Sequence, residues 1–281
     1  KLFIPNSMLF GKMILDYLDD EEGLNVSYEY QIVDNIVIFK FNRGKLNSIT
    51  METLQGLNEA LDRVNNEEAL KGIVLTGNGK YFSGGFDLGT FTSFQSKEEI
   101  LDWFNFEEDV LLKLFTCSKP VVAAINGHAT AMGMILSMAC DYRLVVDNPK
   151  IKLGMTEIKI GLSLTLVQGT VMRFGLDTDK KYRDVIYKGE FFTPDYAVAQ
   201  GIFDELAENE ETLLEKAKAK VVSMIDTPGR PFIILKELEK MQTVDWLKGK
   251  IKDVDWTPLI TTFTDEKVVN TLKMVKAALG E

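Results

Sequence analysis

The sequence predicts an α/β protein in which a largely parallel sheet precedes a helical C-terminal third. Short β-branched runs recur at 72–76, 120–125 and 141–147, and segments with helical periodicity separate them, as in crossover units. Two of these runs end in glycine-rich turns, which are typical of a strand end that leads into a helix. After Arg173 the longer periodic segments predict helices rather than strands.

The elements follow in order along the chain. Residues 13–22 predict a short acidic helix, and Tyr28 to Val33 and Asn35 to Asn42 predict a hairpin that turns at Asp34-Asn35. Thr50 is a plausible cap for the next helix. Further elements are expected at 72–76 (strand), 96–116 (helix), 120–125 (strand), 132–139 (buried helix), 141–147 (strand), and, as helices, at 180–187, 194–200, 211–225 and 265–279. Residues 226–231 form a Pro/Gly-rich break.

Composition excludes several classes of function. With 281 residues, 46% of them hydrophobic, the chain can form one large domain with an appendage. A net charge of −10 argues against nucleic acid as a partner, and no apolar run reaches the roughly 18 residues of a membrane span. Cys117 and Cys140 lack the spacing of a zinc site, which predicts reduced thiols and no metal. We expect a cytoplasmic protein, with a mitochondrial or peroxisomal location left open because the sequence starts at Lys1.

Two glycine turns carry the first chemical signal. One is Tyr81-Phe-Ser-Gly-Gly-Phe-Asp-Leu88, and the other lies within Lys119-Pro-Val-Val-Ala-Ala-Ile-Asn-Gly-His-Ala-Thr-Ala-Met-Gly133. Either turn alone is most simply a tight turn. Both turns follow an apolar strand and lead into an expected helix. This arrangement would leave backbone N–H groups near Phe86 and Met132 free to bind an oxyanion.

Glu157 is the candidate acid–base group. It lies between Gly154 and Gly161, and the almost entirely apolar stretch 162–167 follows it. A carboxyl against such a wall would have a raised pKa, which suits proton transfer. His128 is the only histidine and is better explained by a structural role, which argues against a Ser-His-Asp triad. Asp87 is expected to cap a helix, and Lys45 is either an ordinary loop lysine or a ligand contact.

Five motifs in order resemble the crotonase superfamily, the enoyl-CoA hydratase/isomerase group. They are the turn at 81–88, the stretch 119–127, Cys140-Asp-Tyr-Arg143, the segment 154–161, and Tyr187 to Asp204. The resemblance runs from about residue 28 to the C-terminus.

The resemblance implies a fold and a substrate class. It implies a core of repeated ββα units in a spiral at 28–200, a helical trimerisation region at 201–281 and an extension at 1–27, in a homotrimer or hexamer. It implies acyl-CoA thioester substrates, with coenzyme A as part of the substrate and no cofactor. Its oxyanion donors fall on Phe86 and Met132, and its substrate-binding residues fall on Lys45, Leu46, Gly84, Gly85, Phe86, Asp87, Leu88 and Met132.

Departures from the family pattern indicate the activity. Ile135 stands where hydratases have their first glutamate, and Thr165 stands where dienoyl isomerases and hydroxyacyl-CoA hydrolases have an aspartate. This pattern, with Glu157 as the single carboxylate, is most similar to that of the mitochondrial-type Δ3,Δ2-enoyl-CoA isomerases. The alternatives are a specialised hydratase or hydrolase in which Glu107 or Glu108 replaces the missing carboxylate, and a non-catalytic acyl-CoA-binding protein.

Two further interpretations concern surfaces. The lysine cluster at 236, 240, 248, 250 and 252 is interleaved with acidic residues, so we expect a solvated helix face rather than an RNA-binding one. Lys267 or Lys273 is a candidate partner for the phosphates of coenzyme A. Candidates for the acyl pocket are Leu162, Leu164, Leu166, Trp103 and Phe104.

Overall fold

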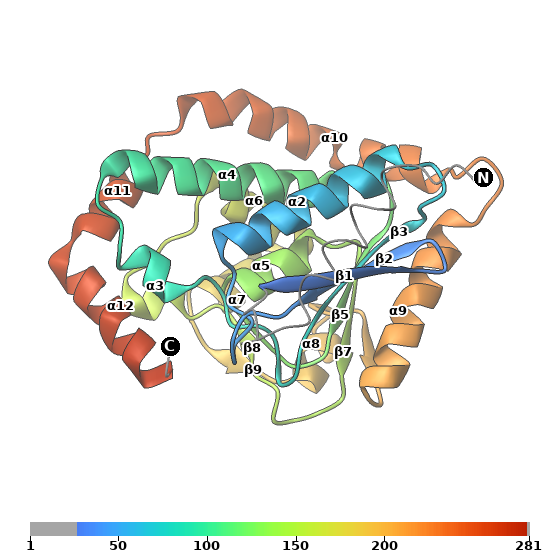
Figure 1. Cartoon of the computed structure of the whole chain (residues 1–281), viewed down its shortest axis with the longest axis horizontal. Coiled ribbons are helices and arrows are strands. Elements are labelled where there is room, and N and C mark those ends of the chain that lie inside the picture. The colour runs from blue at the N-terminus through green and yellow to red at the C-terminus, as the bar shows by residue number, and fades with distance from the viewer. Residues whose placement is uncertain (1–26, 280–281) are drawn as a thin grey trace, which may run out of the picture.

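The computed structural model describes residues 27–279 (Figure 1). The helix expected at 13–22 lies outside these residues. The predicted strands and helices within them are found, with their ends within about two residues of the expected positions, which is the usual uncertainty of such boundaries.

A six-stranded sheet forms the centre of the molecule. Its strands lie in the order β1 (Tyr28–Val33), β2 (Ile36–Phe41), β3 (Gly72–Gly77), β5 (Val121–Ile125), β7 (Tyr142–Val146) and β10 (Glu205–Ala207). The hairpin β1–β2 is antiparallel, and every other pair is parallel, as expected. Asp34 and Asn35 both have positive φ, which is the backbone of a two-residue hairpin turn. Because β10 lies in this sheet, the sheet continues past the division expected at residue 200.

A second sheet continues from the ends of the first. It contains β4 (Tyr81–Ser83), β6 (His128–Thr130), β8 (Leu153–Gly154) and β9 (Phe191–Phe192), with β4, β6 and β8 parallel. Three times in succession, a strand of the first sheet leads into a strand of the second and then into helical structure. The fold is therefore the repeated ββα arrangement that the resemblance implied.

Helices cover both faces of the large sheet. On one side lie α2 (Met51–Asn66), α4 (Lys97–Phe115), α5 (Met132–Ala139) and α6 (Leu166–Gly175), and on the other α9 (Glu210–Ile225) packs on β3, β5 and β7 (Figure 1). Thr50 caps α2 and Ser96 caps α4 through their side-chain oxygens, so both helix starts are fixed by the sequence. All eight residues of α5 are buried, which explains why its sequence shows no polar face.

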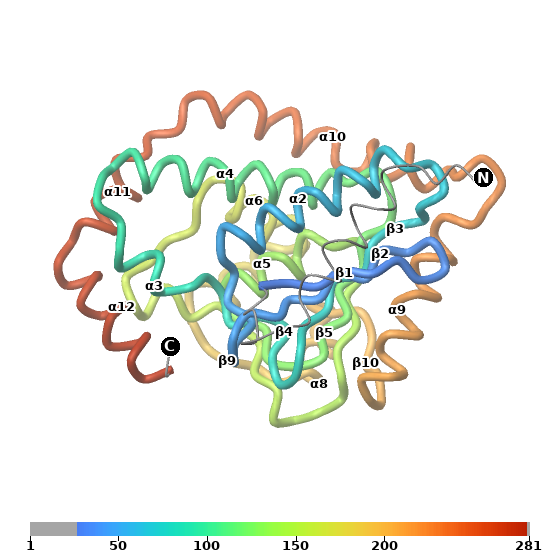
Figure 2. Tube along the Cα trace, viewed as in Figure 1, coloured from blue at the N-terminus to red at the C-terminus, as the bar shows by residue number. Residues whose placement is uncertain are grey.

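The remaining helices are mostly C-terminal. They are α3 (Leu88–Phe91), η1 (Glu157–Ile160), α7 (Asp179–Ile186), α8 (Pro194–Ala199), α10 (Phe232–Lys250), η2 (Ile251–Asp253), α11 (Thr257–Thr264) and α12 (Glu266–Leu279). Figure 2 shows α12 beside α3, and α11 contacts α4. The last two helices therefore return to the end of the molecule where α3, the helix after the first glycine turn, begins.

The expectation that the lysine cluster forms a solvated helix face is wrong for Lys236 and Lys240, whereas Lys248, Lys250 and Lys252 are exposed as expected. Lys236 and Lys240 on α10 are each only 5% exposed. Lys236 Nζ lies 2.5 Å from Asp141 Oδ2, and Lys240 Nζ lies 3.1 Å from Asp141 Oδ1. Their spacing of four residues places both ammonium groups on one face of the helix, against the start of β7.

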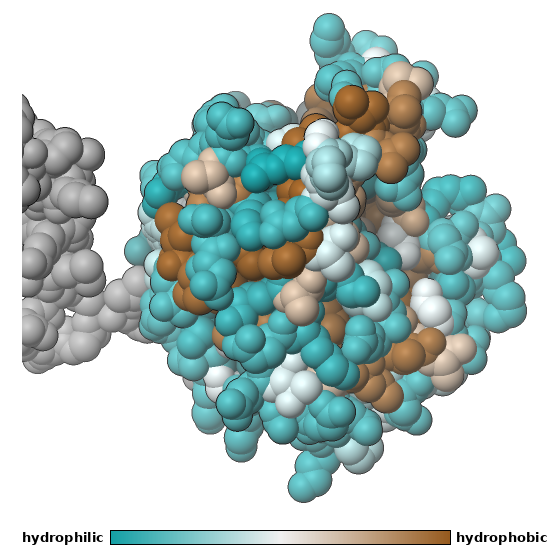
Figure 3. Space-filling view, turned by 90° about the vertical axis from the view of Figure 1, so that its right-hand side faces the viewer, coloured by the Kyte–Doolittle hydropathy of each residue, from teal (hydrophilic) through white to brown (hydrophobic). Residues whose placement is uncertain are grey.

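α10 also exposes several large apolar side chains among its charged ones. Its exposed large hydrophobic residues are Ile234, Leu235, Leu238, Met241 and Trp246. In Figure 3, brown surface lies at the top of the molecule, where Figure 1 places α10. Such a patch on one helix is typical of a surface that associates with another protein.

Candidate active site

The two glycine turns meet in space. Gly85 has a φ of +113°, and a Cβ atom at this position would lie 2.6 Å from the Cβ of Ala131 and 3.5 Å from the backbone nitrogen of Met132. Thr130 Oγ1 donates a hydrogen bond to the carbonyl of Gly84 at 3.0 Å. Only glycine fits at position 85, because any side chain would clash with the second turn and would also strain the backbone.

Among the turns, loops and helix caps of residues 27–279, no backbone carbonyl accepts a hydrogen bond from the N–H group of Phe86 or Met132. A short parallel β-bridge joins Ile49 to the first glycine turn. In this bridge the amide of Asp87 donates to the carbonyl of Ile49, and the amide of Phe86 takes no part. Met132 begins α5, and the residue before it, Ala131, makes no side-chain cap. A helix start without a cap leaves its first N–H groups free.

Both residues line a cavity of about 500 Å³, which we call the inner cavity. Its wall is mainly apolar, and residues from both the N-terminal and the C-terminal part of the described chain form it. The hydrophobic residues of the wall include Leu46, Leu88, Phe91, Phe104, Ile135, Leu162, Leu164, Leu259, Phe263, Val275 and Leu279. Such a lining, with a few polar groups that converge on it, is typical of a small-molecule site.

Glu157 is the only acidic residue that lines the inner cavity within the described part of the chain. Burial raises the pKa of its carboxyl from 4.5 to about 7, and hydrogen bonds from the backbone of Glu157 and Thr156 partly oppose this rise. Its Oε2 atom is buried and has no hydrogen-bond partner among the described residues. A carboxyl with this pKa can both take up and release a proton near neutral pH.

The structure brings together most, but not all, of the residues predicted from the sequence. Glu157, Phe86, Met132, Leu46, Gly84 and Leu88 line the inner cavity. Gly85 lies where the two turns touch, and Asp87 caps α3 by accepting from the amide of Thr90, as expected. Lys45 is exposed in the turn before Leu46 and does not line the cavity.

Glu107 and Glu108 are both buried, and neither lines the inner cavity. Glu107 accepts a hydrogen bond from Gln168, and Glu108 accepts one from the amide of Val167. Thr165 caps α6 and forms a reciprocal pair of hydrogen bonds with Gln168. The two glutamates therefore hold the start of α6 rather than face the site.

The sequence analysis missed several residues of the wall. Phe263 of α11 and Val275 of α12 close one side of the inner cavity, although α11 had not been predicted. Lys276 of α12, which the sequence analysis did not name, approaches α3, because its Nζ would lie 2.8 Å from a Cβ at Gly89. Of the proposed acyl-pocket residues, Leu166 lines a different cavity, and Trp103 lines neither.

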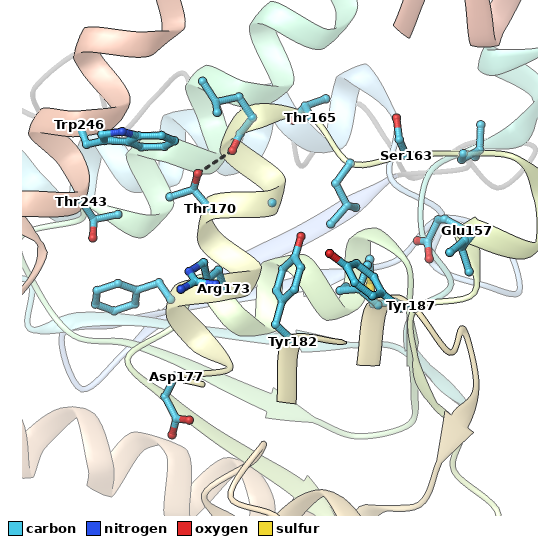
Figure 4. Close-up of a pocket in the computed structure, with 18 of the residues that line it drawn as sticks. Glu157, Ser163, Thr165, Thr170, Arg173, Asp177, Tyr182, Tyr187, Thr243 and Trp246 are labelled. Carbon is cyan, nitrogen blue, oxygen red and sulfur yellow. Dashed lines mark hydrogen bonds between the residues drawn. The ribbon is translucent and has the colours of Figure 1, made fainter. Parts of the chain in front are cut away.

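A second, wider cavity also reaches Glu157. This cavity of about 1150 Å³, which we call the outer groove, shares Glu157, Leu162, Ser163 and Leu164 with the inner cavity. In Figure 4, Glu157 lies at one end of the outer groove and Trp246 lies at the other, with the two tyrosines Tyr182 and Tyr187 between them. Trp246 is 49% exposed and Tyr187 is 61% exposed, so the groove is open to solvent.

His128 lies at the rim of the inner cavity. Its Nδ1 accepts a hydrogen bond from the amide of Lys152 at 2.8 Å, and its ring packs on Tyr81. Burial lowers the pKa of this imidazole. Within residues 27–279, no group of three His, Cys, Asp or Glu side chains is placed to hold a metal ion. No helix of that range is both long and apolar enough to cross a membrane.

An apolar cavity with two free amides at its turns and one buried carboxyl is the kind of site that handles a carbonyl compound by proton transfer. The family comparison agrees with this class. Residues 31–273 match the family model for enoyl-CoA hydratase/isomerase, so the chain belongs to that family.

Some relatives within the family are named isomerases and others are named hydratases. Mouse enoyl-CoA delta isomerase 1, mitochondrial, is 26% identical over 75% of this chain and 72% of its own length. A putative enoyl-CoA hydratase of Thermus thermophilus is 31% identical over 72% of this chain and 79% of its own length.

The structural comparison addresses the fold. The crystal structure of human mitochondrial delta3-delta2-enoyl-CoA isomerase has a TM-score of 0.81 and 22% identity, and the match covers 90% of this chain and 98% of that one. At this identity, the similarity establishes the fold alone.

Proposed function

We propose that this protein is a Δ3,Δ2-enoyl-CoA isomerase in which Glu157 is the single proton shuttle. The observation that carries the proposal is that Glu157 is the only acidic residue lining the inner cavity within the described chain. Ile135, which stands where the family resemblance implies a second glutamate, lines the same cavity. Addition of water ordinarily uses two acid–base groups, but moving a proton within one substrate requires only one.

The proposed reaction follows from the placement of these groups. The acyl group of the substrate would occupy the inner cavity, with its thioester oxygen accepting hydrogen bonds from the amides of Phe86 and Met132. The carboxylate of Glu157 removes a proton from C2, and the electrons delocalise into a dienolate whose negative charge lies on that oxygen. The same carboxyl then returns the proton to C4, which leaves a double bond between C2 and C3.

Free amides support this role because they are held in place before the substrate arrives. Each preorganised donor contributes on the order of 3 kcal/mol to stabilising an oxyanion. The close contact between Gly85 and Ala131 fixes the spacing of the two turns. We infer that no cofactor is needed, because proton transfer beside a thioester requires only a base and these donors.

The experiment is a paired assay of the purified protein. Conversion of trans-3-hexenoyl-CoA is measured beside hydration of crotonyl-CoA, for the wild type and for Glu157→Gln. We expect strong isomerisation, weak hydration, and a loss of isomerisation by a factor of about 100 to 10,000 in the variant.

Two results would reject the assignment. Strong hydration would mean that a second acid or base completes a hydratase site. Tight binding of acyl-CoA without turnover, unaffected by Glu157→Gln, would indicate a non-catalytic acyl-CoA-binding protein.

A further inference from the structure

A single short segment of chain stands between the inner cavity and the outer groove. Residues 162–164 line both spaces, so the wall between them is one segment thick at this place. We call these three residues the partition. Leu162 and Leu164 are half-buried and pack against the hydrophobic core, whereas Ser163 between them is exposed. In Figure 4, Ser163 lies at the same end of the outer groove as Glu157.

The partition is held at both ends by hydrogen bonds. At one end the amide of Leu162 donates to the carbonyl of Glu157 at 3.0 Å. At the other end Thr165 caps α6, since its side chain accepts from the amide of Gln168 and its own amide donates to Gln168 Oε1. Because these bonds involve neither leucine side chain, the size of a leucine in the partition can be changed separately from the position of Glu157.

The charges in the inner cavity indicate how a substrate would lie. Lys152 is the only lysine or arginine that lines the inner cavity in the described part of the chain. It is exposed, and its amide bonds His128 at the rim. The phosphates of coenzyme A are attracted to such a lysine, so this part of the substrate would leave the cavity there. The acyl chain beyond C4 would then start beside Glu157, which has to reach C4 to return the proton.

From Glu157 a growing acyl chain meets two kinds of wall. On one side Phe263 of α11 packs against the rings of Phe91 and Phe104, with centroid distances of 4.9 and 5.2 Å. All three rings are buried, and a close-packed interior has no room for further atoms. On the other side the partition has the outer groove of about 1150 Å³ behind it. The partition is therefore the wall behind which a longer chain would find space.

The outer groove offers apolar surface next to Leu164. A Cβ atom at Gly169 would lie 4.0 Å from Leu164 Cβ and 3.7 Å from the hydroxyl of Tyr182, so both side chains adjoin the same glycine. Burial of CH2 groups against apolar side chains is favourable. The apolar and aromatic residues of the groove beyond the partition include Leu166, Phe174, Tyr182, Ile186, Tyr187 and Trp246.

We propose that Leu164 determines the length of acyl chain that the protein accepts. With leucine at this position the chain ends within the inner cavity, and a longer chain needs the space that the partition closes off. A smaller side chain at position 164 admits the distal end of the chain to the outer groove. The inference rests on the proposed function in so far as the inner cavity holds the acyl group of an acyl-CoA.

The test measures equilibrium binding by calorimetry, so it does not depend on turnover. The ligands are saturated acyl-CoAs in a series of butanoyl-, hexanoyl-, octanoyl-, decanoyl-, dodecanoyl- and tetradecanoyl-CoA. For the wild type, affinity is expected to rise about fourfold with each CH2 group that is buried. It should stop rising at one length, which we call the limit. If no member of the series binds, the proposed function fails and the inference fails with it.

Variants of opposite size are expected to move the limit in opposite directions. Leu164→Ala should bind chains beyond the wild-type limit more tightly than the wild type, by about fourfold for each further CH2 group that it buries. Leu164→Phe should move the limit to shorter chains. Misfolding cannot produce both shifts. Leu166→Ala changes a nearby leucine that lines only the outer groove, so it is the control and should keep the wild-type limit.

Four results would overturn the inference while leaving the proposed function intact. The first is a wild type without a limit in this series, and the second is an unchanged limit in both Leu164 variants. The third is a shift in Leu166→Ala equal to that in Leu164→Ala, which would show that the effect is not specific to the partition. The fourth is a longer limit in Phe263→Ala but not in Leu164→Ala, which would direct the chain toward α11.

Discussion

Replacing Glu157 by glutamine should reveal how much stability the protein loses by burying this carboxyl. The pKa of the group rises from 4.5 to about 7, mainly because burial removes water from its charged form. The unfolded chain restores the ordinary value. A difference of about 2.5 units corresponds to about 3 kcal/mol in the free energy of unfolding.

The sign of the effect is set by which state loses its proton first. Below pH 4.5 the carboxyl is protonated in both states, so it has no differential effect. Between pH 4.5 and 7 the unfolded state ionises while the folded state still holds its proton, so stability falls as pH rises. Above pH 7 the folded protein carries the whole penalty. Glutamine does not titrate, so the Glu157→Gln variant does not carry this penalty.

The assay is urea denaturation of the wild type and Glu157→Gln at pH 4 and pH 8. Relative to the wild type, the variant is expected to gain about 3 kcal/mol between the two pH values. Glu211→Gln, which changes an exposed glutamate on α9, is the control and should show no such gain. If Glu157→Gln differed from the wild type equally at both pH values, folding would not raise the pKa of Glu157 and the reasoning would be wrong.

Four further predictions concern other parts of the molecule. The kcat/KM for isomerisation is expected to rise with pH through about 7, because Glu157 must be ionised to act as a base; a flat profile in Glu157→Asp and the wild type alike would contradict this. Asp141→Asn should destabilise the fold by about 3–5 kcal/mol in urea melts, since it leaves two buried ammonium groups without a counter-ion. Gly85→Ala should abolish turnover while circular dichroism shows retained helix content, because its Cβ meets Ala131. Leu238→Glu should lower the mass measured by light scattering if the exposed face of α10 joins copies of the chain; an unchanged oligomer would exclude this face.

The sequence predicted the elements whose signals are local. The hairpin turn at Asp34-Asn35, the cap at Thr50 and the strand-to-helix turns depend on neighbouring residues, and the structure agrees with each. The raised pKa of Glu157 was also predictable, because the apolar stretch after it signalled burial. Each of these predictions required only a short window of sequence.

What the sequence could not supply was the long-range pairing of distant segments. Lys236 and Lys240 look solvated in their own helix, and only Asp141, nearly 100 residues earlier, explains their burial. Likewise, Trp256 at the start of α11 makes no side-chain cap, and Pro258 in the first turn is a weak local sign that the sequence analysis did not use. Its residue Phe263 reaches the inner cavity through tertiary packing that a one-dimensional pattern does not encode.

The position of Glu157 between the inner cavity and the outer groove has an isotopic consequence. A carboxyl enclosed on every side would return to the product the same hydrogen that it removed. Here the groove is open to solvent, so a proton held by Glu157 can exchange with water while the acyl group occupies the inner cavity. In heavy water, deuterium should therefore appear at C4 of the product, in a proportion that reports how exchange competes with proton return.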